Sequence, residues 1–142
     1  MRVRIFLVLF VCLLACGGCG KKSTDQLIQD LKSSQVKERL IAVRLLQERK
    51  GDAAKVVPAL IEALKDKESD IRWSAAIGLG YFGNQAKDAI PALEVAQNDR
   101  DARVREAARV ALSRIDPSLP QKAASAGPKQ QGKVASSRSG KK

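Results

Sequence analysis

The central part of the chain carries apolar residues at the spacing of amphipathic helices. Over residues 57–64 and again over 71–82, apolar side chains recur every three or four positions, so each stretch has one face that must be buried. The polar run 65–70 predicts a turn, and Gly83 predicts the end of the second helix. Pro58 is expected in the first turn of its helix, where a missing N–H costs nothing. The alternation typical of strands persists nowhere, so the pattern predicts pairs of helices.

The helix pair recurs at a fixed period. A shift of 33 residues places 27–32 on 60–65, 57–60 on 90–93 and 71–72 on 104–105. A constant period of about 20 to 50 residues indicates stacked supersecondary units, each of which needs its neighbours to bury its apolar face. The sequence therefore predicts an all-α fold, a short α-solenoid (superhelix) of about three helix pairs over residues 24–116, with disordered termini.

These units resemble a known family, the short HEAT-like repeats also found in phycobilin lyase subunits. The resemblance lies in the pattern Asp-x-x-Val-Arg-x-x-Ala-x-x-x-Leu, followed by Gly and by a Pro-Ala-Leu opening of the next unit. Residues 101–112 fit this pattern well, and 68–83 fit it with Glu68 for the first Asp. The first unit has Glu38 in place of Val or Ile, so we interpret it as an N-terminal cap. The resemblance implies a right-handed solenoid whose second helices line one face and which holds other proteins.

One arginine recurs in the motif of every unit. Together with acidic residues of the turns, these arginines are expected to form a ladder between units, a structural role that we favour over ligand contact. The inter-repeat residues predicted in this way are Arg39, Arg72, Arg105, Asp70 and Asp101.

The second helix of the middle unit has an unusual stripe. Trp73, Ile77 and Tyr81 recur every four residues, and they include the only Trp and the only Tyr of the chain. An aromatic centre with charged neighbours is typical of protein-binding hot spots. We hypothesise that a partner docks here; the alternative is that Trp73 packs over the edge of a small core. The predicted partner-binding residues are Trp73, Ile77, Tyr81, Arg44, Val110 and Arg114.

The net charge of +11 resides at the two ends of the chain. Residues 1–22 and 117–142 contain basic residues and no acid, so the repeat region is close to neutral, which argues against a nucleic-acid partner. The segment 117–142 has only two sizeable apolar residues and is expected to be disordered. It is either a basic tail that binds anionic lipid or a wall polymer, or a solubilising tail without a partner.

The N-terminus resembles a bacterial lipoprotein export signal. Arg2 and Arg4 precede the apolar run 5–14, which is shorter than the roughly 20 residues that span a bilayer. The sequence Leu-Leu-Ala-Cys ending at Cys16 resembles a lipobox, which implies cleavage after residue 15 and acylation of Cys16. Residues 16–23 would then be a tether, and Gly17 in place of Asp favours the outer membrane, facing the periplasm. The alternative is an ordinary secretory signal with a chance cysteine.

The sequence contains no recognisable set of catalytic residues. The chain has no histidine, no nucleophile beside a base, and no loop with the six or more oxygens that calcium needs. We therefore expect neither catalysis, nor a metal, nor a cofactor. The function predicted is a non-enzymatic scaffold or adaptor that binds another envelope protein and is held to a membrane by its lipid. The alternatives are a chromophore-lyase-like helper subunit, suggested by the family alone, and a structural linker whose basic tail binds anionic lipid or wall polymer.

Overall fold

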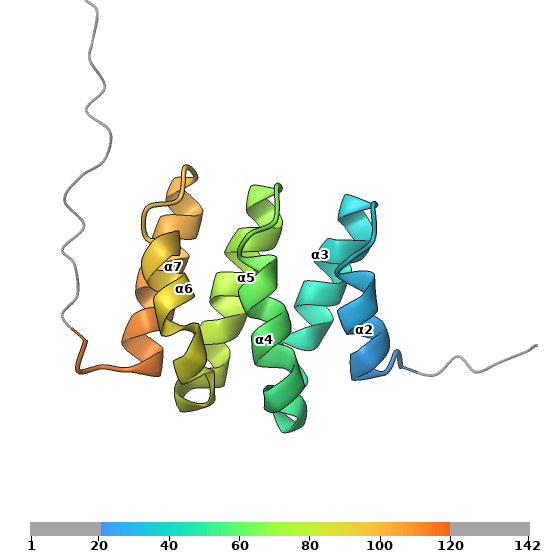
Figure 1. The fold of residues 1–142 in the computed structure, drawn as a ribbon, viewed down its shortest axis with the longest axis horizontal. Coiled ribbons are helices and arrows are strands. Elements are labelled where there is room, and N and C mark those ends of the chain that lie inside the picture. The colour runs from blue at the N-terminus through green and yellow to red at the C-terminus, as the bar shows by residue number, and fades with distance from the viewer. Residues whose placement is uncertain (1–20, 120–142) are drawn as a thin grey trace, which may run out of the picture.

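The computed structural model describes residues 21–119, and over this range the chain is a stack of helix pairs (Figure 1). No strand occurs among the described residues. The first helices of the pairs form one layer and the second helices form another, which confirms the predicted all-α solenoid. The helices in chain order are α2 (Thr24–Asp30), α3 (Val36–Leu46), η1 (Lys50–Asp52), α4 (Ala53–Ala63), α5 (Ser69–Phe82), η2 (Gly83–Ala89), α6 (Ile90–Ala96) and α7 (Ala102–Ile115), where η1 and η2 are 3-10 helices.

Several predicted features lie outside the described residues. These are the signal peptide 1–15, Cys16 with most of the tether 16–23, and the tail 117–142 beyond residue 119. Within the described part, no helix is long and apolar enough to cross a membrane.

Helix ends follow local capping chemistry. At the start of α2 the Ser23 hydroxyl accepts a hydrogen bond from the Gln26 backbone N–H, and the Gln26 side chain accepts one from the Ser23 N–H. The Asp101 carboxylate accepts from the backbone N–H of Arg103 at the start of α7. Helix α5 ends as expected at Gly83, whose φ of 52° favours glycine.

The placement of Pro58 in a first turn is wrong. Helix α4 already begins at Ala53, so Pro58 lies inside it and is exposed on its surface. The earlier start has a packing reason, because Val56 becomes helical and is fully buried in the core. In the next unit, Pro91 does occupy the first turn of its helix.

One hydrophobic core runs through all three pairs. The equivalent leucines Leu27, Leu60 and Leu93 are fully buried in successive units. The predicted buried stripe of α5 is confirmed, since it lies inside this core; its members are Ile71, Ala75, Leu79 and Phe82. Continuity of the core explains why each pair depends on its neighbours.

Candidate functional site: a groove between α5 and α7

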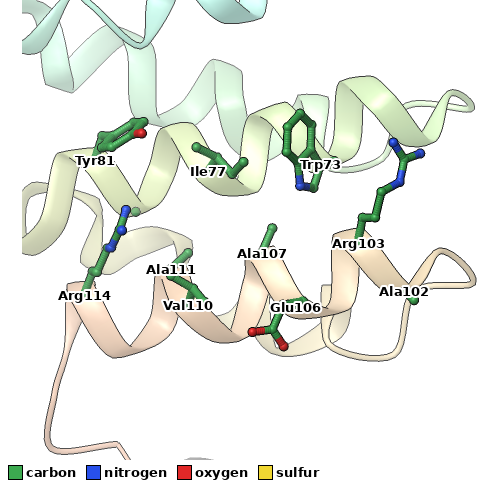
Figure 2. Close-up of a pocket in the computed structure, with 11 residues that line it drawn as sticks. Trp73, Ile77, Tyr81, Ala102, Arg103, Glu106, Ala107, Val110, Ala111 and Arg114 are labelled. Carbon is green, nitrogen blue, oxygen red and sulfur yellow. The ribbon is translucent and has the colours of Figure 1, made fainter. Parts of the chain in front are cut away.

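A groove with a volume of about 510 Å³ lies between α5 and α7 (Figure 2). Side chains of Trp73, Ile77 and Tyr81 project from α5 along its length, and Val110 and Arg114 of α7 face them. The complete lining consists of Trp73, Ile77, Gly80, Tyr81, Ala102, Arg103, Glu106, Ala107, Val110, Ala111 and Arg114.

Small residues bring the two helices together beneath the groove. A Cβ placed on Gly80 would lie 3.1 Å from the Cα of Ala111, so the backbones approach too closely for a larger side chain. Trp73 and Ile77 are half-buried and pack against the core, whereas Tyr81 is 53% exposed. The groove therefore has an apolar interior and one aromatic side chain open to solvent.

The charged side chains at the rim of the groove form ion pairs, except at the end that contains Arg114. Arg103 lies 3.0 Å from both the Asp70 and the Asp101 carboxylates, and Glu106 pairs with Arg109. Arg114 has no acidic partner among residues 21–119. Its guanidinium carbon lies 5.5 Å from the centre of the Tyr81 ring, which is a cation–π arrangement (Figure 2).

The structure brings together most of the predicted partner-binding residues. Trp73, Ile77, Tyr81, Val110 and Arg114 all line the groove. Arg44 does not; it is exposed on α3, at the position equivalent to Ile77 in the preceding unit.

Sequence reasoning missed the other residues of the α7 wall. Arg103, Glu106 and Ala107 lie on the same helical face as Val110 and Arg114, at spacings of three and four. Helical periodicity applied to α7 would have found them.

The motif arginines form a second, structural arrangement. Arg39 donates from Nε and Nη2 to the Asp66 carboxylate over 2.7 and 3.1 Å, and Arg72 donates in the same way to Asp99 over 2.7 and 2.8 Å. In each case Nη1 donates to two backbone carbonyls of the turn before its own helix. Each buried arginine therefore joins its own turn to the turn of the next unit.

The acids in this ladder differ from those expected. Asp66 and Asp99 each lie in the turn after the first helix of a pair, where they pair with the arginine of the preceding unit, whereas Asp70 and Asp101 bind Arg103. Arg105 keeps the two turn hydrogen bonds, to the carbonyls of residues 99 and 100, but has no acidic partner within the described range. It belongs to the last described unit, so no following turn is there to supply one.

Electrostatics of the acids follow from these contacts. The hydrogen bond from Arg72 holds the pKa of Asp99 below its ordinary value against the opposing effect of burial. Burial acts to raise the pKa of Asp66, but hydrogen bonds from Arg39 and from the Glu68 backbone N–H lower it overall. Hydrogen bonds from Arg103 hold the pKa of Asp101 low. Residues 21–119 contain no cluster of acids and cysteines that could hold a metal ion.

The fold, the period and the arginine ladder define a helical-repeat solenoid. Within that class, the chain belongs to the HEAT repeats, whose family pattern matches residues 24–113. A chain of "the complex of CpcE and CpcF of phycocyanin lyase from Nostoc sp. PCC7120" is similar in structure, with a TM-score of 0.61 and 30% sequence identity. The match covers 70% of this chain but only 40% of that one. No curated protein matches this sequence.

Proposed function

We propose that this protein is a non-enzymatic interaction module that docks another envelope protein in the α5–α7 groove. The observation that carries the proposal is the groove itself, which combines an apolar interior, an exposed tyrosine and an arginine that has no acidic partner among residues 21–119. A few residues contribute most of the binding energy at a protein interface, and Trp, Tyr and Arg are enriched among them. The similar chain from Nostoc comes from a complex of two proteins, which also supports a role in protein binding.

Site-specific photocrosslinking tests the groove. A photoreactive residue at position 81 should capture a partner in the native envelope, whereas one at position 95 should not. Val95 provides a matched control because it is 75% exposed on α6 and does not line the groove. The captured protein is then purified and its affinity measured directly, so that capture alone does not decide the question.

Two substitutions separate docking from packing. Tyr81→Ala should weaken binding of that partner by about 30-fold, a typical hot-spot loss of about 2 kcal/mol, without changing stability. Val95→Ala should leave both quantities unchanged. Trp73→Ala tests the alternative that this side chain only covers the edge of the core: loss of stability with binding retained would support packing and contradict docking.

We also propose that Cys16 carries a lipid that holds the protein to the membrane, with the outer membrane favoured. The support is the sequence of the export signal, which lies outside the described residues. Mass spectrometry should find the chain beginning at an acylated Cys16, and Cys16→Ser should release the protein from the membrane fraction. An unprocessed, unacylated chain would contradict the tether but not the groove.

A second candidate is a lyase-like helper subunit, favoured by the structural similarity to a chain of phycocyanin lyase. This function predicts binding to phycocyanin subunits, measurable by surface plasmon resonance with the purified protein. Lack of binding at micromolar concentration would exclude the helper-subunit function.

The third candidate function is a structural linker, and it requires the basic tail. Deletion of 117–142 should then reduce retention of the protein in the envelope, and unchanged retention would exclude the linker role.

A further inference from the structure

The two ends of the helix stack differ in polarity. At the C-terminal end, Arg109 and Ser113 of α7 occupy the positions that Ala76 and Gly80 hold in α5, one period earlier. Polar side chains thus replace the small residues that pack against a following unit. This is the outer face expected of a terminal, capping repeat.

The N-terminal end presents an apolar strip on α3. Ile41 is 55% exposed and Leu45 is 36% exposed. One period later, Ser74 and Gly78 face the preceding unit and are buried there. The Gln47 side chain of that unit donates to the carbonyl and the hydroxyl of Ser74 over 2.9 and 3.0 Å. Ile41 and Leu45 therefore point to where a preceding unit would lie, and none of the described residues 21–119 provides one.

Side-chain size argues against another HEAT unit as the occupant. A Cβ on Gly78 would come within 2.8 Å of the Gln47 side chain, and Ala111 holds the equivalent position in α7, so only small residues occur there where two described repeats stack. Leu45 holds the equivalent position in α3 and is far larger. Head-to-tail stacking of two copies also fails on polarity, because it would bring this apolar strip against Arg109 and Ser113.

The charges beside the strip are complementary to those of an α3 helix from a second copy that runs antiparallel. The helical neighbours of Ile41 are Glu38 and Arg44, at three residues on either side, and Lys37 and Leu45, at four. Two α3 helices that cross antiparallel at Ile41 place Glu38 of each copy opposite Arg44 of the other. They also place the aliphatic part of Lys37 over Leu45 of the second copy. Neither Lys37 nor Arg44 has an ion-pair partner within residues 21–119.

We propose that the protein forms a two-fold symmetric dimer through α3, centred on Ile41. A two-fold axis uses the same surface on both copies and closes, so it leaves no strip exposed for further association. The α5–α7 groove is lined by residues of other helices, so none of its lining residues belongs to this interface.

Disulfide trapping in the intact envelope tests this dimer with the full chain. Two differently tagged copies carrying Ile41→Cys are co-expressed and oxidised. Both also carry Cys19→Ser, because Cys19 is the one free thiol that the proposed cleavage and acylation at Cys16 would leave. Residues at a two-fold axis are close enough to bond, so a product that contains both tags is expected. Val95→Cys, on an exposed site of α6, is the matched control and should give none. No product at position 41, equal products at both positions, or a bond to another protein would overturn the proposal.

Charge exchange provides an independent test. Ile41→Glu and Glu38→Arg should each convert the detergent-extracted protein from two chains to one in sedimentation experiments. Glu38→Arg combined with Arg44→Glu should restore the dimer, because the opposite charges then face each other again. Circular dichroism should show unchanged helix content, and Tyr81→Ala should leave the dimer intact. A single chain in the parent protein, or a double variant that stays a single chain, would contradict the α3 interface.

Discussion

At the scale of single residues, burial distinguishes structural charges from surface charges. Arg39 and Arg72 are 6% and 5% exposed, and each makes two hydrogen bonds to a carboxylate and two to carbonyls. Arg103 also contacts two carboxylates, but it is exposed, and water screens its ion pairs. The number of ion pairs is therefore a poor guide to which arginine holds the stack together.

Removal of Arg72 should be strongly destabilising. Arg72→Ala leaves the Asp99 carboxylate and two turn carbonyls without their donor, which costs about 3–5 kcal/mol when a buried pair is broken. Arg72→Lys should recover little, since an ammonium cannot make the paired hydrogen bonds to the carboxylate. Urea unfolding at neutral pH measures both variants. Arg105→Ala is the matched control, because Arg105 makes the same turn contacts but has no acidic partner within residues 21–119. A loss in the free energy of unfolding as large as that of Arg72→Ala would contradict the stabilising role of the arginine–carboxylate pairs.

At the scale of elements, helix-to-helix distance decides which residues are tolerated. Helices α5 and α7 approach at Gly80, opposite the backbone of Ala111. Helix α3 meets α5 through the contact of Gln47 with Gly78. The approach at Gly80 and Ala111 gives the α5–α7 groove its floor of small residues.

Enlarging Gly80 should push α5 and α7 apart. Gly80→Val adds a branched side chain where even a Cβ meets the Ala111 backbone at 3.1 Å, so we expect a loss of about 1–3 kcal/mol in the free energy of unfolding. Partner binding in the groove should weaken as well. Gly51→Ala is the control: its site is open and its φ is not positive, so stability should stay unchanged or rise by up to about 1 kcal/mol. Equal destabilisation by both would show that close approach is not the cause.

At the scale of the whole molecule, the ladder makes stability depend on pH at the acidic end only. The chain has no histidine, so no side chain of that type titrates between pH 5 and 8. Hydrogen bonds from the arginines lower the pKa of Asp66 and Asp99 in the folded state, so their ionised forms favour folding. This contribution is complete above the unfolded pKa of about 3.9 and is lost as the pH falls through the lower folded pKa.

Urea unfolding should therefore give a similar stability from about pH 5 to 8 and a steep decline below about pH 4. The variant Asp66→Asn with Asp99→Asn should be less stable at pH 7 and should lose less between pH 4 and 2. A parent protein whose stability is unchanged down to pH 2, or a double variant with the same acid slope as the parent, would contradict this account.

Much of the fold could be predicted because its signals are local. Residues 71, 75, 79 and 82 share one face by helical spacing alone, and the period of 33 follows from direct comparison of the units. Trp73, Ile77 and Tyr81 belong to the groove for the same reason. The start of α4 was missed because residues 53–56 are helical and Val56 is buried in the core, which their immediate sequence does not reveal.

By itself, then, the sequence determined the helix pairs, their repetition and the α5 side of the groove, because spacing along a helix fixes which side chains share a face. Tertiary structure alone decided that Asp66 and Asp99, and not Asp70 and Asp101, pair with the motif arginines. It also decided which strip of α3 stays uncovered. Those outcomes depend on the distance and rotation between neighbouring helices, and these are set by packing across units that lie far apart in the chain.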